Sequence, residues 1–373
     1  MRRRRLSKYL GDGTMPLIGV AALLLTLVVI GMVFLVPSPA ASPTTQPEDK
    51  RAGALQTYEY SATILFMGDT MLGRTVGPAI IAGDNPYKYV SAILSSYDLR
   101  IANIESVVAD PAIATTPQPK RYTFNAPLAG LQTLKAQSID VNVLANNHTG
   151  DYGPAAMANT IDNFDTAGLR HVGAGRTVAE AFAPLIVDVP MHATANAPKA
   201  TVRLAFIAFN DFENVYSDVS SSRTGSAYFN KEELQKSIAS AREQGARLIF
   251  AVPHWGTEFQ LNQHNARQQM IGHWLIDNGV DAVVGGHPHV IQPTEYYQGK
   301  PIVYSMGNFI FSGMESIANT SRGQMIGFTL SATIKSTSSA DSIATSPSLG
   351  KPIYHLYNLD LNGYPVPEVT KDD

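Results

Sequence analysis

The sequence predicts an α/β fold in which polar side chains gather at the carboxyl ends of buried strands. Short apolar runs rich in Val, Ile and Phe recur along the chain, and each is bounded by Gly, Pro or Asn, as is typical of buried strands. Segments with the features of amphipathic helices alternate with these runs. In such sheets, polar groups at the carboxyl ends of the strands form the functional site.

Five of the apolar runs end in a polar cluster. The runs cover residues 62–67, 99–102, 140–144, 247–252 and 281–284. The clusters that follow them are Gly68-Asp69, Asn103-Ile104-Glu105, Asn146-Asn147-His148 with Asp151, His254-Trp255-Gly256 with Glu258 just after, and Gly285-Gly286-His287-Pro288-His289. A further cluster, residues 210–213, either lines the cleft or forms a solvated loop.

The remaining elements follow from the same patterns. Further strands are expected at residues 204–208, 327–334 and 353–359. Helices are expected at residues 127–137, 154–167, 231–244 and 265–277. Residues 336–348 are rich in Ser and Thr and are expected to form a loop.

The polar clusters together predict a metal site. Carboxylate, amide and imidazole groups suit divalent first-row metals without thiolates, and the chain has no Cys. His287 and His289 stand one residue apart on a turn, so they can reach two different ions. A single Asp after a strand, such as Asp69, is more often a turn former or a helix N-cap. The prediction therefore depends on the convergence of all five clusters.

The ordered motifs resemble the CapA family of capsule and poly-γ-glutamate biosynthesis proteins, over about residues 60–330. The motifs are Gly68-Asp69-Thr70-Met71 with Arg74, Asn103-Ile104-Glu105, Asn146-Asn147-His148 with Asp151, His254-Trp255-Gly256, Gly286-His287-Pro288-His289 and Ser305-Met306-Gly307-Asn308-Phe309. The resemblance implies a calcineurin-like metallophosphoesterase fold, a sandwich of two mixed β-sheets flanked by helices. It also implies a two-metal site at the strand ends.

The resemblance assigns roles to individual residues. The implied metal ligands are Asp69 and His289 for the first ion, Glu105 in the bridging position, and Asn147, His254 and His287 for the second ion. The implied catalytic group consists of His148, Arg74 and Asp151, and His148 faces the substrate as general acid or phosphate-positioning group. The expected cofactor is one or two divalent metal ions, with manganese, zinc and iron as the candidates.

Two positions depart from the superfamily pattern. Met71 stands where the superfamily has a histidine, and a thioether is a weak ligand for hard divalent ions. Glu105 replaces an aspartate and adds a methylene group to the bridging position. We therefore expect the second metal site to be more complete than the first. Arg74 offers a planar, permanently charged group that can bind carboxylate or phosphate oxygens there.

The first 57 residues predict a membrane anchor and a linker. Residues 1–14 carry a net charge of +4, and residues 15–36 are uncharged and long enough to cross a bilayer. The positive-inside rule places residues 1–14 in the cytoplasm and the domain of residues 58–373 outside. Residues 37–57, rich in Pro, Ser and Thr, form a linker. The alternative is a cleaved signal peptide, because residues 39–42 offer small side chains after the apolar run.

Charge and motifs leave two functional classes open. The whole chain carries −3, so residues 37–373 carry −7, which excludes nonspecific nucleic-acid binding through a basic surface. In the first class, the protein is a membrane-bound accessory subunit that works with polymer synthase or export subunits and handles an anionic polymer such as poly-γ-glutamate. In the second, it is a metal-dependent hydrolase of phosphoesters or of the polymer at the cell surface. The residue at position 71 favours the first class.

Overall fold

The computed structural model describes residues 55–193, 196–212, 217–336 and 342–368. The predicted membrane span at residues 15–36, its cytoplasmic flank and most of the predicted linker lie outside these ranges. Within them, every helix is too short or too polar to cross a bilayer. Strand β1 begins at Gln56, two residues before the predicted start of the domain.

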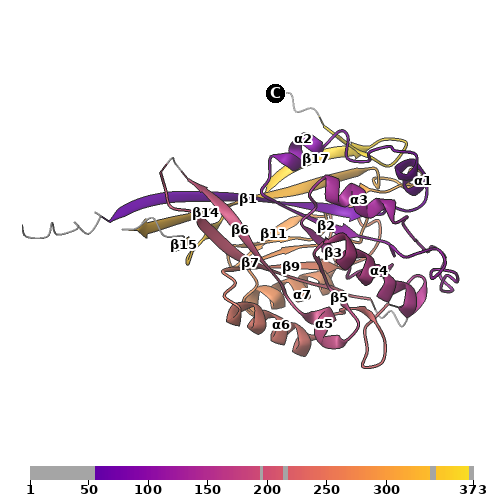
Figure 1. The fold of residues 1–373 in the computed structure, drawn as a ribbon, viewed down its shortest axis with the longest axis horizontal. Coiled ribbons are helices and arrows are strands. Elements are labelled where there is room, and N and C mark those ends of the chain that lie inside the picture. The colour runs from indigo at the N-terminus through magenta and orange to yellow at the C-terminus, as the bar shows by residue number, and fades with distance from the viewer. Residues whose placement is uncertain (1–54, 194–195, 213–216, 337–341, 369–373) are drawn as a thin grey trace, which may run out of the picture. The chain divides into compact units, whose positions relative to one another are not determined.

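Two mixed β-sheets form the centre of the domain and are joined through β6 (Figure 1). The first sheet contains β1 (Gln56–Thr70), β2 (Leu99–Ile104), β3 (Val141–Val143), β4 (His171–Val172), β13 (Asn308–Ile310), β14 (Arg322–Ser336), β16 (Ser348–Leu349), β17 (Ile353–Leu359) and β18 (Pro365–Pro367). The second contains β6 (Leu185–Ala193), β7 (Ala200–Asn210), β9 (Leu248–His254), β10 (Ala282–Val284), β11 (Thr294–Tyr297), β12 (Lys300–Val303) and β15 (Ser342–Ile343). A separate two-stranded sheet pairs β5 (Ala174–Gly175) with β8 (Gly225–Ser226).

Each large sheet combines parallel and antiparallel pairs. In the first sheet, β1, β2, β3 and β4 are parallel, whereas β14 and β17 pair antiparallel. In the second sheet, β7, β9, β10 and β12 are parallel, and β6 and β11 pair antiparallel at their flanks. Because parallel strands end at the same edge, the carboxyl ends of β1, β2 and β3 lie together, as do those of β7, β9 and β10.

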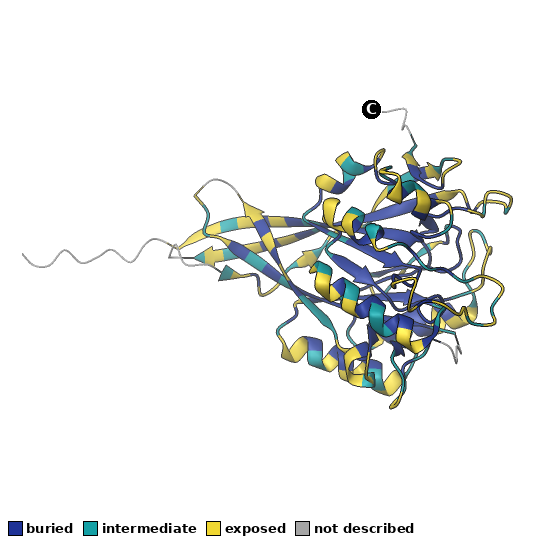
Figure 2. Cartoon of the chain, turned by 45° about the vertical axis from the view of Figure 1, so that its right-hand side comes forward, coloured by how far each residue is buried: buried dark blue, intermediate teal, exposed yellow. Residues whose placement is uncertain are grey.

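Side chains of successive strand residues point to opposite faces, and this alternation supplies two sets of cores. In β1, Ile64 and Phe66 enter the core between the two sheets, whereas Leu65 and Met67 pack against helices on the outer face. Residues of β7 alternate in the same way. Phe206 belongs to the core between the sheets, whereas Ala205 and Ile207 pack against the helices on the outer face of the second sheet. Figure 2 shows that the strands are buried in the centre of the domain, that their projecting ends alternate between exposed and buried residues, and that the helices are exposed on their outer faces.

Helices cover the outer face of each sheet and complete four layers (Figure 1). The first sheet is covered by α1 (Val76–Ile81), α2 (Ser91–Ser95), α3 (Ala129–Ala136) and α4 (Gly153–Ala167). The second is covered by α5 (Val178–Phe182), α6 (Lys231–Glu243) and α7 (Ala266–Asp277). The predicted sandwich of two mixed sheets between helices is confirmed.

The longer helices begin and end close to their predicted limits because their ends carry local signals. Asn265 caps α7, and it exchanges hydrogen bonds with Gln268 in a capping box. The prediction of an irregular loop at residues 336–348 was wrong in part. Strand β15 pairs with β7, and β16 begins at Ser348 and pairs with β14. Two-residue strands are too short to carry a periodic pattern, so only tertiary pairing forms them.

Candidate metal centre

The structure brings together the five polar clusters that end the predicted strands. Asp69 is the penultimate residue of β1, Glu105 directly follows β2, and His254 is the last residue of β9. The turn after β10 carries His287 and His289. These five side chains are all buried. Asn147, after β3, joins them through its Oδ1 atom, 2.9 Å from His254 Nε2.

Glu105 lies at the centre of this cluster without a hydrogen bond to either carboxylate oxygen, among the described residues. Three imidazole nitrogens surround its Oε1 atom, at 3.7 Å for His254 Nε2, 3.7 Å for His289 Nε2 and 3.8 Å for His148 Nε2. These distances are too long for hydrogen bonds. A buried carboxylate that lacks protein donors is costly unless another group neutralises it.

Asp69 is held on two sides by neighbouring elements. Its Oδ1 atom accepts a hydrogen bond of 2.8 Å from Asn103 Nδ2, and its Oδ2 atom accepts one of 3.0 Å from the His287 backbone N–H. Gly286 permits this approach, since a Cβ atom there would lie 2.5 Å from Asp69 Oδ1. The His289 Nδ1 atom lies 3.5 Å from Asp69 Oδ2.

The histidine turn has an unusual backbone. His287 has a φ of +96° and His289 a φ of +57°, in the left-handed region that residues with a Cβ seldom adopt. Asn308 orients the His289 imidazole, because its Oδ1 atom lies 2.7 Å from His289 Nδ1. The Nδ2 atom of Asn308 donates a hydrogen bond to Thr320 O, which holds the amide in place. Strained backbone that neighbouring contacts hold in place is characteristic of functional sites.

His148 is oriented by a carboxylate on the same loop. Its Nδ1 atom lies 2.7 Å from Asp151 Oδ2, which also accepts a 2.7 Å hydrogen bond from the Phe124 backbone N–H. Lys120 forms an ion pair with Asp151 and donates a hydrogen bond of 2.7 Å to Asn147 O. The Phe124 ring stacks on the His148 imidazole with centroids 4.2 Å apart. Nδ1 is thereby engaged, and Nε2 is the nitrogen that faces Glu105.

Arg74 and Met71 lie beside the cluster and not within it. The Arg74 guanidinium donates a 2.9 Å hydrogen bond to Ser312 O and stands 4.6 Å from the centre of the Phe124 ring. Met71 packs with Phe124 and Phe311, and its sulfur accepts a hydrogen bond from the Gly73 N–H. Arg74 reaches the cluster through the Phe124 ring, and its role in the site stays a prediction.

Burial sets the protonation of the cluster. It raises the pKa of Glu105 well above its usual value, and the neighbouring carboxylates of Asp69, Glu258 and Asp151 raise it further. Burial also raises the pKa of Asp69, although the nearby His289 opposes this. The pKa values of His254 and His287 fall well below the usual value, through burial first and then through neighbouring imidazoles. The two imidazoles are thus neutral, the form that binds metals.

The residues present fit a divalent metal ion. Two sets of donor atoms are present, and within each set all atoms lie within 4.8 Å of one another. One set comes from Asp69, Glu105 and His254, and the other from Glu258, His287 and His289. Two ligand atoms that each lie about 2.1 Å from one ion are roughly 3–4 Å from each other. The distances from Glu105 Oε1 to the three surrounding imidazole nitrogens fall in this range. Both oxygens of the buried Glu105 carboxylate lack a hydrogen-bond donor among the described residues, and three imidazole nitrogens stand around one of them. A cation satisfies the carboxylate and the imidazoles at once.

Three further residues contribute to the site. Glu258, which follows the fourth polar cluster in the sequence, is exposed but reaches His287 and His289, and Phe212 packs on His287 with ring centroids 4.2 Å apart. Phe212 belongs to the cluster at residues 210–213, so this part of the cluster lines the site. Phe124 carries no polar group that would mark it as functional. Its role depends on contacts between residues that are distant in sequence.

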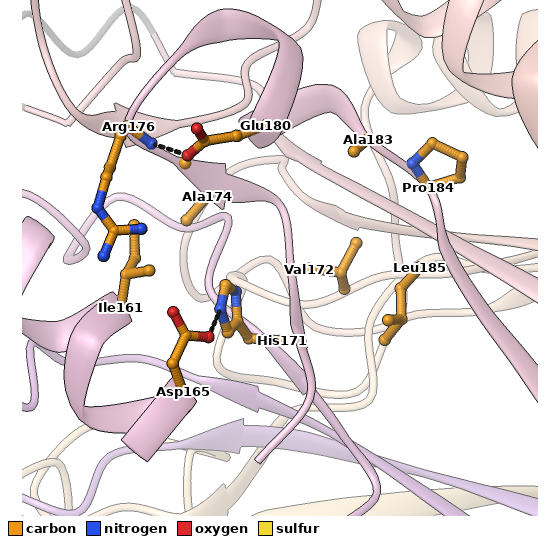
Figure 3. Close-up of a pocket in the computed structure, with 11 residues that line it drawn as sticks. Ile161, Asp165, His171, Val172, Ala174, Arg176, Glu180, Ala183, Pro184 and Leu185 are labelled. Carbon is orange, nitrogen blue, oxygen red and sulfur yellow. Dashed lines mark hydrogen bonds and ion pairs between the residues drawn. The ribbon is translucent and has the colours of Figure 1, made fainter. Parts of the chain in front are cut away.

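A cavity of about 320 Å³ lies elsewhere, between α4, α5 and the start of β6 (Figure 3). His171 lines it and pairs with Asp165 at 3.1 Å, and Arg176 also extends along its wall. None of its lining residues belongs to the predicted site. His171 therefore lies outside the metal centre.

Residues 63–313 match a family model described as bacterial capsule synthesis protein PGA_cap. The chain is 30% identical over 255 residues to "Capsule biosynthesis protein CapA" of Bacillus anthracis, which covers 67% of this chain and 59% of the relative. It is 30% identical over 257 residues to "PGA biosynthesis protein CapA" of Bacillus subtilis (strain 168), covering 68% and 64%. The matches thus span less than two thirds of these relatives.

Among solved structures, the calcineurin-like phosphoesterase YfkN from Bacillus subtilis is similar with a TM-score of 0.49 and 15% identity, covering 80% of this chain and 91% of that chain. The family match includes every residue of the buried cluster from Asp69 to Asn308. The chain therefore belongs to the bacterial capsule synthesis protein family PGA_cap.

Proposed function

We propose that this protein is an accessory subunit of capsule biosynthesis that handles or exports an anionic polymer such as poly-γ-glutamate. The observation that carries the accessory role is the environment of Met71. Its side chain is buried between Phe124 and Phe311, and its sulfur already accepts a backbone hydrogen bond. The position that would supply a further imidazole to the first metal is therefore apolar, which favours binding of a ligand over catalytic turnover.

The metal centre takes part in this proposal as the polymer-binding pocket. Asp69, Glu105, Asn147, His254, His287 and His289 would hold one or two divalent ions, with manganese, zinc or iron as candidates. A bound ion supplies Lewis acidity towards a carboxylate or phosphate oxygen. The protein's own part is to keep the imidazoles neutral and the carboxylates in place, as the contacts of Asp69 and His289 do.

A metal-dependent hydrolase is the second candidate, and one observation favours it. Asp151 holds His148 by Nδ1, so that Nε2 faces the cluster beside Glu105. This is the arrangement that positions an imidazole to transfer a proton at a fixed point. Burial lowers the pKa of His148, although Asp151 opposes that shift. Because the net shift is downward, the neutral imidazole is available as a proton acceptor.

One substitution separates the two candidates. For a hydrolase, His148→Asn lowers turnover by about 10²–10⁴-fold, the range for loss of a general acid or base. For an accessory subunit, capsule production stays near the unmutated level. His171→Asn is the matched control, because that histidine also pairs with an aspartate but lies outside the cluster. Capsule lost with His148→Asn alone, at equal protein level, contradicts the accessory role.

The proposal includes a single-pass anchor at residues 15–36, with the main domain outside the cytoplasm and in contact with polymer synthase or export subunits. The uncharged run and its basic flank support this topology. A reporter that works only outside the cytoplasm should be active when fused after Thr57 and inactive when fused before Met15. The reverse pattern contradicts the orientation. A secreted form that lacks residues 1–41 favours a cleaved signal peptide.

A further inference from the structure

We propose that Arg74, Arg121 and Tyr122 form a subsite that binds carboxylate groups of an anionic chain next to the metal centre. The identity of the polymer rests on the proposed function, whereas the subsite itself rests on the contacts below. The subsite lies at two loops, one between β1 and α1 and the other between β2 and α3.

Two guanidinium groups contact one exposed aromatic ring in this subsite. The Cζ atom of Arg74 lies 5.2 Å from the centre of the Tyr122 ring, and that of Arg121 lies 5.1 Å from it. Tyr122 is 48% exposed, and Arg121 is exposed as well. In the described part of the chain, neither guanidinium is ion-paired with a carboxylate. Two permanent positive charges, one half-buried at Arg74 and one exposed at Arg121, thus keep donors available to an anion.

Arg74 is held firmly in this position. Its backbone adopts a φ of +45°, a conformation that costs free energy for a residue with a Cβ. Its Nη1 atom donates to Ser312 O, and a Cβ added at Gly313 would lie 2.6 Å from that atom. Among the described residues, Nε and Nη2 make no hydrogen bond, so one edge of the guanidinium stays available. A preorganised arginine with an available edge suits a carboxylate.

The subsite adjoins the metal centre through Phe124. This ring contacts both the Arg74 guanidinium and the His148 imidazole, whose Nε2 lies 3.8 Å from Glu105. Arg74 and the metal cluster are therefore separated by a single aromatic ring. The aromatic ring also excludes water from one side of the guanidinium, which strengthens its attraction for an anion.

An apolar surface continues from Arg74 on the other side. Arg74 lines a cavity of about 230 Å³ whose walls include Pro78, Pro111, Pro127 and Ile81. Ile81 is 68% exposed. Methylene groups pack favourably on such a surface, whereas a chain composed only of phosphates has none. The combination of arginines and apolar wall fits a polymer in which carboxylates are separated by methylene groups.

The test measures binding of fluorescently labelled poly-γ-glutamate of defined length to the full-length protein. The variants are Arg121→Gln and the double variant Arg74→Gln with Arg121→Gln. Arg247→Gln is the matched control, because Arg247 is exposed and precedes β9 at the end opposite His254. We expect Arg121→Gln to weaken binding about 2–5-fold and the double variant about 10-fold or more, since charge-assisted contacts to a carboxylate are lost.

Four outcomes overturn the subsite. Equal weakening by Arg247→Gln would mean that overall charge governs binding. Unchanged binding by the double variant would exclude a role of the two arginines in polymer binding. If that variant does not fold, unchanged binding by Arg121→Gln leads to the same conclusion. Equally tight binding of inorganic polyphosphate would exclude the selection of methylene-spaced carboxylates. Failure of the wild-type protein to bind the polymer likewise excludes the subsite.

A separate experiment, the measurement of capsule production in cells, tests the proposed function. Normal capsule in a strain that lacks the protein rejects the proposed function, whatever the binding assay gives. Reduced capsule in that strain, together with unaltered polymer binding by the double variant, rejects the subsite alone. Support for the subsite requires selective weakening by the two arginine substitutions and no change with Arg247→Gln.

Discussion

Replacement of Glu105 by glutamine should stabilise the metal-free protein and weaken its metal binding. Glu105 is fully buried, and neither of its oxygens has a hydrogen-bond partner among the described residues. Its pKa is raised well above the usual value by burial and then by nearby carboxylates. Without a cation, the ionised side chain is therefore a source of instability. A neutral amide of nearly the same shape removes that charge.

An unpaired buried charge costs more than an unpaired neutral polar group, whose own cost is about 1–3 kcal/mol, and we take the difference to be of the same order. For a domain of this size, each kcal/mol corresponds to about 2 °C in Tm, so the gain is about 2–6 °C. In the presence of divalent ions, the wild-type protein should be more stable than the Glu105→Gln variant. At a concentration 100 times Kd, an ion stabilises the wild-type protein by about 2.7 kcal/mol, and the Glu105→Gln variant should gain less.

Thermal unfolding with chelator and with added manganese measures both effects. Glu295→Gln is the control, because the Glu295 carboxylate accepts hydrogen bonds from Tyr304 and His273, and that substitution should destabilise the protein under both conditions. A lower Tm of the metal-free Glu105→Gln protein would refute the reasoning. An equal gain in Tm from manganese in variant and wild type would refute the role of Glu105 as a ligand.

The same carboxylate gives a pH dependence with a definite sign. A raised folded-state pKa means that the folded protein binds a proton that the unfolded chain has already lost. The stability contributed by protonated Glu105 is therefore present at low pH and is lost as pH rises through the folded-state pKa. Denaturant unfolding of the metal-free protein should show a steeper loss of stability with rising pH for wild type than for Glu105→Gln.

Three further substitutions test the support around the centre. Asn308→Ala removes the partner of His289 Nδ1 and should weaken metal affinity about 10–100-fold in equilibrium dialysis; unchanged affinity would exclude this support. Gly286→Ala places a Cβ 2.5 Å from Asp69 Oδ1 and should cost about 1–3 kcal/mol in thermal unfolding, with neutrality as the contrary result. Trp255→Phe leaves a buried carbonyl without its 2.8 Å indole donor and should cost about 1–3 kcal/mol in the same assay; an unchanged Tm would contradict this.

Sequence patterns predicted the five buried strands that end in polar clusters, because a strand buried on both faces appears in the sequence as a continuous apolar run. Strand β9 (Leu248–His254) is buried throughout, so its residues form a continuous apolar run that ends in a polar group. Strand β7 was recognised only over part of its length. Its first residues alternate between buried and half-exposed positions and therefore lack a continuous apolar run. Strand β6, in which Asp188, Pro190 and His192 interrupt the apolar residues at every other position, was not predicted.

The buried part of the site was predicted because its residues follow strands in a fixed way. Asp69, Glu105 and His254 each stand at or next to the end of a buried strand, and the structure gathers them. The position of Arg74 was predicted less well. The sequence places it near Asp69, but its guanidinium direction depends on Ser312, which is 238 residues away. Long-range packing of this kind leaves no local pattern.

Residues that act through others were also missed for physical reasons. Phe124 is an ordinary core residue by composition, and its significance comes from stacking on His148. Lys120 lies in a loop without periodicity, and its pairing with Asp151 depends on how that loop folds back. The grouping of Glu258 with His287 and His289 likewise arises only when the turns after β9 and β10 meet.

Metal content of the purified full-length protein tests the central claim most directly. After equilibrium dialysis against manganese, zinc or iron, elemental analysis should find at least one ion bound per chain in the wild-type protein. A variant that combines Glu105→Gln with His254→Asn should bind markedly less, while Glu295→Gln should bind as much as wild type. Absence of bound metal in the wild type, or equal metal content in all three proteins, would contradict a metal centre built around Glu105.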